Sequence, residues 1–420
     1  MQGSADTEQA TAQPPVKDGE HTLHAWLTLA GSFLVYFVTF GYINSYGFFH
    51  DHYALNELKD YPVSLIALIG SLQLGLMYIV GPIAGALFDA YGPTRLYIVA
   101  TVGTVAASIC ASFAQPGRAW QYILSQGVLF GVTVAFGTYV AMPLVGQHFK
   151  RRRGLALGLL NGGSSAGGVC LPIMFSKLTP QIGLPWAIRV AALITLFCYG
   201  TAILISKPKL PPQPLKSSRE LLDFNGFKDI RYSVLALASV VGNFGLYVPY
   251  YYLEPYLALH FPGSSMGTYL LPLLNASSFF GRVSGGFVAD HVGPLNLLYP
   301  MTITSGLLCL TLWLFANSVA MVITFNCLYG FSSGIFISVM PSIVAHISPP
   351  EKMGARLGAF SFWGAIGVFT GTPIGGAFIR HDTAQEYVHL IAYTGSCMAG
   401  AGVLLFVARI ICDRDLRSKW

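Results

Sequence analysis

The chain has 420 residues, of which 54% are apolar and only 10% are charged, and its mean hydropathy is +0.58. Soluble domains carry about 25% charged residues, and disordered chains combine high charge with low hydrophobicity, so this composition excludes both classes. The 46 glycines and 24 prolines recur without a fixed period, which excludes a collagen-like chain and leaves a protein whose solvent is lipid.

Apolar segments long enough to cross a bilayer recur along the whole sequence. A spanning helix needs about 20 mostly apolar residues. We expect an all-α membrane protein with twelve transmembrane helices in two pseudo-symmetric groups of six. The first group is predicted at 25–49, 63–88, 95–114, 119–144, 152–176 and 184–205. The second group is predicted at 232–257, 265–289, 294–316, 319–347, 355–379 and 386–411.

Polar stretches flank and separate these two groups. Residues 1–24 are predicted to be a disordered cytoplasmic tail, and 412–420 a short cytoplasmic tail. The stretch 206–231 contains four prolines and is predicted to be a cytoplasmic linker, with an interfacial helix in SRELLDF. The predicted domains are therefore an N-terminal half, 25–205, and a C-terminal half, 232–411.

The basic residues predict the orientation of the chain. Of the 24 Lys and Arg, 18 fall on the side that carries both termini, 4 fall on the other side, and 2 lie inside spans. Because basic residues gather in cytoplasmic loops, both termini are predicted to be cytoplasmic. The plasma membrane is the expected location, with a vacuolar or other internal membrane as the alternative. The net charge of +6 is thereby explained without a nucleic-acid partner.

An internal repeat relates the two halves. The pattern GxxxDxxGP occurs at 85–93 and again at 286–294, 201 residues later. Two six-span halves that repeat in parallel orientation are a recurrent plan of transporters, with the substrate held near the midplane. The residues of both copies that we expect to act in gating are Gly85, Asp89, Gly92, Arg95, Gly286, Asp290 and Gly293.

The segment GALFDAYGPTR resembles the loop signature of the major facilitator superfamily. The resemblance implies a latch that holds the cytoplasmic side closed, with Arg95 as its basic member. The Asp89 carboxylate can accept backbone N–H groups at a helix N-terminus or pair with an Arg. The second copy has Asn296 and no Lys or Arg in its loop, so we expect a weaker second latch.

Within this superfamily, four segments resemble the monocarboxylate-transporter-like branch, especially its fungal members. These segments are GYINSYGFFHDHY, RRRGLALGLLNGGSSAGG, SSFFGRVSGGFVAD and GARLGAF. The resemblance implies transport of a small organic, carboxylate-bearing solute.

Arg282 is predicted to be the main substrate-binding residue. It stands eight residues before Asp290, so it lies about 12 Å inside the span at 1.5 Å per residue. A charge at that depth is costly and marks a cavity or a partner, and Arg holds carboxylates through two hydrogen bonds. The resemblance implies the same role. The alternative is a structural Arg that pairs inside the bundle.

The sequence departs from the branch where a proton relay would be expected. Mammalian members carry an Asp where this chain has Ser278, and a Lys in the first span, where this chain has Ile43 and Asn44. Protons are therefore expected as a partner only if another group couples them. The candidates are Glu254, His50, Asp51 and His52.

Further cavity residues are predicted among polar and aromatic groups in mid-span. The predicted substrate-binding residues, beside Arg282, are Asn44, Tyr46, Tyr139, Asn161, Tyr247 and Asn275. Tyr36, Asn243 and Asn326 share the pattern. For each residue, hydrogen bonding between helices is an alternative. Tyr250–Tyr252 are interpreted as part of an interfacial aromatic belt.

No catalytic residue, metal site or cofactor is expected. Gly163–Gly167 fits G-x-S-x-G, but that motif needs a strand–turn–helix elbow, and here it lies inside an apolar span. The seven cysteines lie in or at the ends of spans without a CxxC pair, which disfavours zinc and disulfides.

We therefore predict a secondary active transporter that works by alternating access, with the lipid bilayer and a small organic anion as partners. The alternatives are efflux of a fungal secondary metabolite and, less favoured, a nutrient sensor that does not transport.

Overall fold

The computed structural model describes residues 22–211, 224–349, 352–379, 383–415 and 418–419. The predicted tail 1–24 up to residue 21, and the linker over 212–223, lie outside the described residues. The described part of the chain consists of helices joined by short connections.

The first half comprises six helical rods, two of which are built from more than one helix. They are α1 (Leu23–Asn44) continued by α2 (Tyr46–Leu55), α3 (Val63–Tyr91), α4 (Pro93–Ser112), α5 (Ala119–Tyr122) continued by η2 (Ile123–Leu129) and α6 (Phe130–His148), α7 (Arg153–Ile182), and α8 (Leu184–Ile205).

A short helix, η4 (Phe224–Lys228), leads into the second half. Its rods are α9 (Ile230–Leu246) continued by α10 (Val248–His260), α11 (Gly267–Val292), α12 (Pro294–Leu308) continued by η5 (Cys309–Trp313), α13 (Val319–Ile347), α14 (Met353–Gly376), and α15 (Ala384–Cys412).

Eleven of the rods in the described part are long and apolar enough to cross a membrane. The twelfth, α11, has 26 residues, which is also a spanning length, but it contains the charged side chains of Arg282 and Asp290. The predicted all-α architecture is therefore confirmed, with eleven apolar rods and a more polar twelfth.

The predicted span limits agree with the structure to different degrees along the chain. Spans 184–205 and 319–347 coincide with α8 and α13 at both ends. The prediction for α7 stopped at 176, whereas the helix continues to Ile182 and ends at Gly183, which takes φ = 79°. Only glycine adopts that conformation without strain, so Gly183 sets the boundary.

The repeated motif forms the same local structure in both halves. Gly92 ends α3 with φ = 76°, and Gly293 ends α11 with φ = 98°. Each glycine is followed by a proline, which starts the next helix as its first residue, a position where the missing N–H is not needed. The pattern therefore specifies a tight turn between two spans.

The first span continues further than predicted and contains a break. The prediction was 25–49, but α1 stops at Asn44 and α2 carries the rod to Leu55. In the second half the break between α9 and α10 lies at Tyr247, and the Tyr329 hydroxyl donates to the Leu246 carbonyl at 2.9 Å. This donation satisfies a backbone acceptor at the break.

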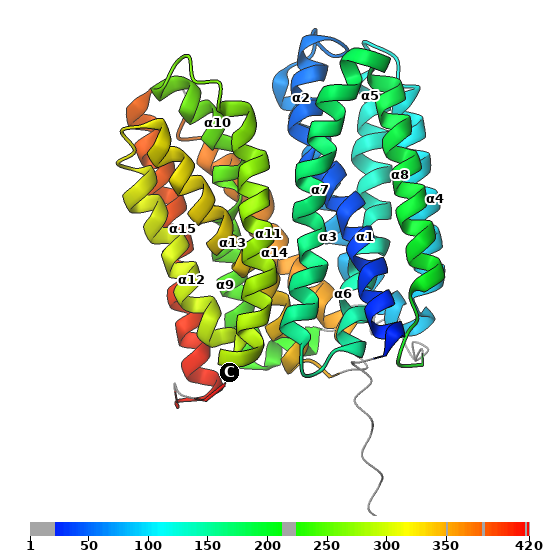
Figure 1. Cartoon of the computed structure of the whole chain (residues 1–420), viewed down its shortest axis with the longest axis vertical. Helices are drawn as coiled ribbons and strands as arrows, with labels where there is room; N and C mark the ends of the chain where they lie inside the picture. The colour runs from blue at the N-terminus through cyan, green and yellow to red at the C-terminus, as the bar shows by residue number, and fades with distance from the viewer. Residues whose placement is uncertain (1–21, 212–223, 350–351, 380–382, 416–417, 420) are drawn as a thin grey trace, which may run out of the picture.

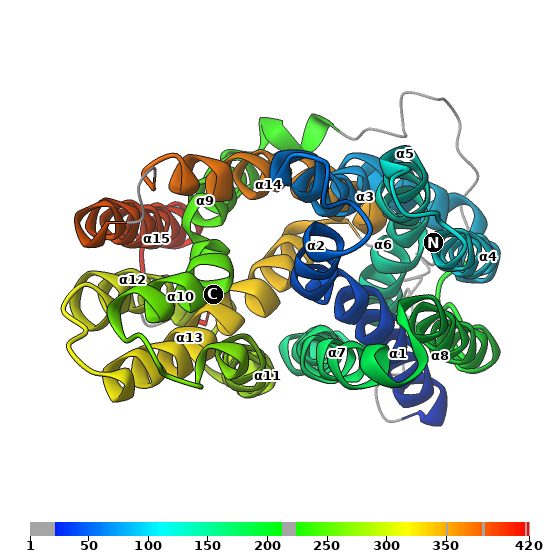
Figure 2. The ribbon, with the colours of Figure 1, turned by 90° about the horizontal axis from the view of Figure 1, so that it is seen from above.

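Figure 1 shows the two halves side by side, with the first described helix beginning and the last ending at the same side. We call this the terminus side. The ribbons of the halves come together there and stand apart at the opposite side. Seen from above, α7 lies beside α11 and α3 beside α14, so these pairs form the junction between the halves (Figure 2).

Candidate functional site: a cavity between the halves

The motif aspartates each cap a helix of the opposite half. Asp89, near the end of α3, accepts the N–H groups of Gly354 at 3.3 Å and Ala355 at 3.0 Å, at the start of α14. This arrangement joins the first half to the second at the terminus side. A carboxylate at a helix N-terminus is stabilised by the unpaired N–H groups and by the helix dipole.

Asp290 repeats this arrangement in the other direction. Near the end of α11, it accepts the N–H groups of Gly154 at 2.7 Å and Leu155 at 2.8 Å, in the first turn of α7. We expected this second copy to be the weaker one, yet its bonds are the shorter pair. These two backbone N–H groups form the cap without a basic residue from the loop.

Glycines allow the backbones to meet at both caps. A Cβ placed on Gly354 would collide with the carbonyl of Gly85, and one placed on Gly154 would collide with the carbonyl of Gly286. Small residues of this kind let membrane helices approach closely. The predicted motif glycines 85 and 286 therefore lie at the junction of the halves.

Arg95 does not pair with Asp89. Its guanidinium lies 5.9 Å from the centre of the Tyr91 ring, and its side chain is exposed. The corresponding residue of the second copy, Asn296, accepts a hydrogen bond from Arg409 at 2.5 Å. The residues at this position thus contact neighbours within their own halves.

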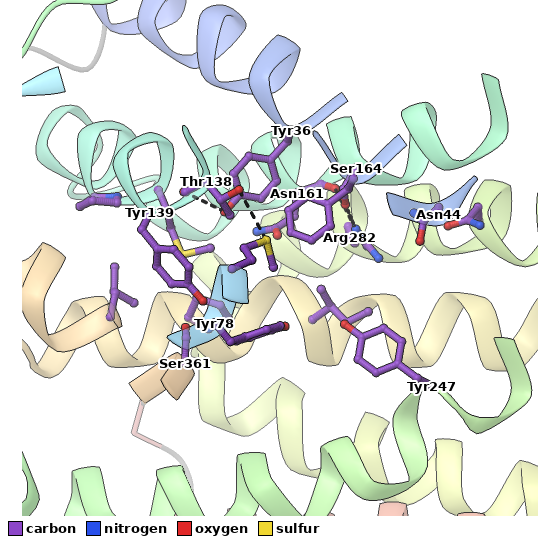
Figure 3. A pocket seen from close by; sticks show the side chains of 18 of the residues that line it. Tyr36, Asn44, Tyr78, Thr138, Tyr139, Asn161, Ser164, Tyr247, Arg282 and Ser361 are labelled. Atoms are coloured by element: carbon purple, nitrogen blue, oxygen red, sulfur yellow. Dashed lines mark hydrogen bonds between the residues drawn. The ribbon is translucent and has the colours of Figure 1, made fainter. Parts of the chain in front are cut away.

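A cavity lies between the halves, near the middle of the bundle. Residues from both halves line it: Tyr36, Phe40, Asn44, Met77, Tyr78, Thr138, Tyr139, Met142, Pro143, Asn161 and Ser164 from the first, and Tyr247, Tyr250, Asn275, Arg282, Ile337, Pro341, Leu357 and Ser361 from the second. Figure 3 shows the side chains of Tyr139, Tyr247 and Arg282 around it. Among the described residues, the lining combines aromatic rings, hydroxyls, amides, aliphatic side chains and one cation.

Arg282 bridges the two halves inside this cavity. Its Nε donates to the Ser278 hydroxyl at 3.1 Å, and one terminal nitrogen donates to the Asn161 carbonyl at 3.0 Å and to the Ser164 hydroxyl. The residue is only 5% exposed. The ion pairs found among the described residues involve His50, His52 and Arg231. None involves Arg282, so no described carboxylate lies within 4 Å of its guanidinium.

The cavity carries its positive charge on the second half only, although the two halves repeat the same motif. The residue 201 positions before Arg282 is Gly81, and the ring of Tyr139 occupies the space where a Cβ on Gly81 would lie. In the first half, the Tyr139 ring therefore takes the space beside Gly81 that a side chain at the position equivalent to Arg282 would enter. One side can pair with an anion, and the other offers an aromatic ring and a hydroxyl.

Six of the seven predicted substrate-binding residues line the cavity. Asn161 is 3% exposed, and its own amide donates to the Leu157 carbonyl at 2.8 Å. Asn44 and Asn275 approach each other around Gly168, whose missing Cβ would lie 2.7 Å from the Asn44 Nδ2 and 2.9 Å from the Asn275 Oδ1. Tyr139, Tyr247 and Arg282 complete the six.

Tyr46, the seventh, does not line the cavity. Its hydroxyl donates to the Ile66 carbonyl, and its ring packs on Gly70 of α3. Tyr46 stands two residues after Asn44, which is about 200° further round a helix of 3.6 residues per turn, so it lies off the face that carries Tyr36, Phe40 and Asn44.

Several lining residues were not predicted to face the cavity. Tyr250 was interpreted as part of an interfacial belt, yet it lines the cavity, whereas its neighbour Tyr251 is 50% exposed. Helical spacing could have found it, because Asn243, Tyr247 and Tyr250 stand at i, i+4 and i+7 on one face. Tyr78, Thr138, Ser164 and Ser361 had no comparable signal in the sequence.

The groups considered for proton coupling lie away from this lining. His50 is 3.2 Å from Asp51, and His52 is 3.3 Å from Glu57, outside the cavity. Glu254 is also absent from the lining. No Asp, Glu or His occurs among the described residues that form the cavity wall.

The G-x-S-x-G segment contributes to packing. A Cβ on Gly163 or Gly167 would collide with the backbone of Phe33 or Phe37, so these glycines let α7 approach α1. The segment lies within the helix Arg153–Ile182, which lacks the strand–turn–helix elbow that a nucleophilic serine needs.

Two similar helical halves with a cavity of apolar, aromatic and polar side chains between them define a membrane transport protein. The family model of the Major Facilitator Superfamily matches residues 28–372, and the chain belongs to that superfamily. The narrower likeness to the monocarboxylate-transporter-like branch stays a prediction.

Fungal transporters are similar over nearly the whole chain. MFS transporter asaE of Aspergillus flavus is 34% identical, over 93% of this chain and 87% of its own length. The fujikurins efflux protein of Gibberella fujikuroi is 33% identical, over 99% of this chain and 88% of its own length. The aspyridones efflux protein apdF of Emericella nidulans is 31% identical, over 96% and 81%.

Solved transporter structures share the fold. The human organic anion transporter MFSD10 (TETRAN) superposes with a TM-score of 0.68 at 16% identity, covering 94% of this chain and 99% of that one. The transporter FucP in its outward conformation superposes with a TM-score of 0.66 at 16% identity, covering 90% of this chain and 99% of that one. The predicted major facilitator fold is thus confirmed.

Proposed function

We propose that this chain exports a small organic anion, with a carboxylate as its expected charged group, by alternating access between the two halves. Both termini would face the cytoplasm, and the plasma membrane is the proposed location. The terminus side, closed by the Asp89 and Asp290 caps, would then be the cytoplasmic side.

The observation that supports this proposal most is the Arg282 guanidinium in the cavity. It is held by neutral oxygens of Ser278, Asn161 and Ser164, and no carboxylate among the described residues lies within 4 Å of it. A buried cation without a counter-charge is unfavourable, and a carboxylate in a bidentate contact is a strong partner for it. The Tyr and Met side chains around it suit a substrate with an apolar or aromatic body.

The direction of transport is proposed from the relatives. Two similar fungal proteins are named efflux proteins, which supports export of a secondary metabolite over uptake of a monocarboxylate. Proton coupling remains a proposal, because the described residues of the cavity wall include no Asp, Glu or His to carry it.

The test is flux into and out of proteoliposomes with a panel of organic carboxylates, with and without a pH gradient. We expect saturable transport that Arg282→Gln reduces to the level of empty liposomes. Arg189→Gln is the matched control, because Arg189 bonds to Ser112 at 3.1 Å and stacks on Trp186 at 4.6 Å, outside the cavity.

Three results would change the proposal. Undiminished transport by Arg282→Gln would remove the anion site. Transport in cells directed only inward would favour uptake. Saturable binding without flux would favour the nutrient-sensor alternative.

A further inference from the structure

One hydrogen-bond acceptor in the cavity wall has no partner among the described residues. It is the side-chain oxygen Oδ1 of Asn275, a residue that lines the cavity and is 1% exposed. The amide nitrogen of the same side chain donates to the Leu271 carbonyl at 3.1 Å, one turn earlier in α11. That bond sets the orientation of the amide, because only the nitrogen can donate to a carbonyl. The atom of Asn275 that lacks a partner is therefore an acceptor.

A second amide, from the opposite half, lies beside this acceptor. Asn44, the last residue of α1, also lines the cavity. A Cβ on Gly168 would lie 2.9 Å from the Asn275 Oδ1 and 2.7 Å from the Asn44 Nδ2, so the two amides meet over the same glycine. Nδ2 is a donor and Oδ1 is an acceptor. The pair is therefore suited to a ligand group that both donates and accepts a hydrogen bond, such as a hydroxyl or an amide.

The amide pair lies about one helical turn from the Arg282 guanidinium. Arg282 donates to the Ser164 hydroxyl of α7, and Gly168 follows Ser164 by four residues on that helix. Four residues of an α-helix span about 6 Å and return to nearly the same face. In the view of Figure 3, Asn44 lies on the side of Arg282 opposite to Tyr139. One extended ligand can therefore reach both the guanidinium and the amide pair.

An acceptor left unpaired in a closed cavity is unfavourable. Burying a polar group without a hydrogen bond costs free energy, and a site built to pair with a substrate hydroxyl discriminates strongly against an analogue that lacks it. A ligand without a donor leaves the Asn275 oxygen unpaired when the halves close around it, whereas a ligand with a donor removes that cost. The carboxylate alone therefore does not determine which anions bind well.

We propose that Asn275 and Asn44 form a second recognition point in the cavity, which selects organic anions that carry a hydroxyl or an amide about one helical turn from the carboxylate. This inference rests on the proposed function, because Arg282 must hold that carboxylate. It adds a substrate class to that function. Hydroxylated or amide-bearing carboxylates bind well, and carboxylates with only an apolar group at the same distance bind weakly.

The test compares p-hydroxybenzoate with p-methylbenzoate, by calorimetric titration of the full chain in lipid nanodiscs at neutral pH. The rigid ring of each probe holds its second group about one helical turn, ~6 Å, from the carboxylate. The methyl group is similar in size to the hydroxyl but neither donates nor accepts a hydrogen bond. Binding is measured instead of flux, because small aromatic acids cross bilayers unaided in their neutral form.

We expect the parent to bind p-hydroxybenzoate roughly tenfold more tightly than p-methylbenzoate, the factor that corresponds to 1.4 kcal/mol. Asn275→Leu should bring the two affinities together and leave p-methylbenzoate bound. The matched control is Asn326→Leu, because Asn326 is also buried with an unpartnered Oδ1 but is not part of the cavity lining; this variant should keep the preference.

Two further variants separate the amide pair from the anion site. Gly168→Ala keeps both amides but adds a methyl group that would displace them, so it should reduce the preference even if Asn275→Leu does not fold. Arg282→Gln should lose both probes.

Three outcomes would overturn the inference. Equal affinity of the parent for the two probes would refute the amide pair and leave the anion site at Arg282 intact. A preference that Asn275→Leu or Gly168→Ala leaves unchanged would also refute the pair, since other residues would then make the selection. Binding of neither probe to the parent would refute the proposed function, and the amide pair with it.

Discussion

Replacing Asp290 by Asn should open the terminus side of the transporter. Asp290 accepts two N–H groups of α7 at 2.7 and 2.8 Å, and both bonds cross between the halves. Hydrogen bonds to a charged group contribute about 1.5–3 kcal/mol each, and a charge at a helix N-terminus adds about 0.3–1 kcal/mol. Asn keeps the shape but loses the charge and one acceptor oxygen.

We expect Asp290→Asn to destabilise the state closed at the terminus side by about 2–4 kcal/mol. Because 1.4 kcal/mol corresponds to a factor of ten, the equilibrium between closed and open states shifts roughly 30-fold or more toward the open state. The same change at Asp89 should act in the same direction but less strongly, because its bonds are 3.3 and 3.0 Å long. This order reverses the one expected from the sequence, in which the second copy was the weaker.

The assay is the labelling rate of a cysteine placed at Leu357, with a membrane-impermeant maleimide applied from the terminus side. Leu357 lines the cavity near the start of α14 and is 3% exposed in the closed state. Cys412, which lies at the same side, is replaced by Ser in all variants. If the cysteine is labelled at the same rate in the Asp290→Asn variant as in the parent, the Asp290 cap does not hold the terminus side closed. A larger effect at Asp89 would refute the ranking by bond length.

The other predictions concern folding as well as transport. Removing residues 413–420 should lower the melting temperature of the purified protein, because the fully buried Arg409 donates to backbone carbonyls in that segment at 2.6–3.0 Å and an uncompensated buried charge costs about 3–5 kcal/mol. The same truncation in an Arg409→Met background should cost much less, and equal losses in both backgrounds would contradict this account. Gly158→Ala should reduce transport and the yield of folded protein, because the new methyl would collide with the Arg282 carbonyl, whereas Gly200→Ala, with no atom within 4 Å of its Cβ position, should match the parent in both measurements.

The positions of the spans could be predicted because each depends on a local property of the sequence. Apolar runs of spanning length located the rods, and the repeated GxxxDxxGP pattern located equivalent turns at Gly92 and Gly293. The depth of Arg282 followed from its distance to Asp290 along one helix. These features depend on the rise of a helix and on the conformations open to glycine and proline, which act within a few turns of chain.

The partners of those residues depended on contacts between the halves. The sequence did not show that Asp89 caps α14 and Asp290 caps α7, because the partners are backbone N–H groups that every residue type except proline provides. It also placed Tyr46 in the cavity, whereas the Tyr46 ring packs on Gly70 of α3. It placed Tyr250 at the interface, although the spacing from Tyr247 to Tyr250 favoured the cavity face. The sequence by itself determined which segments enter the membrane and how deep the cation lies, since lipid imposes length and polarity on each helix separately. Only the tertiary structure decided which groups of the opposite half surround that cation, since its contacts with Asn161 and Ser164 join residues more than a hundred positions apart.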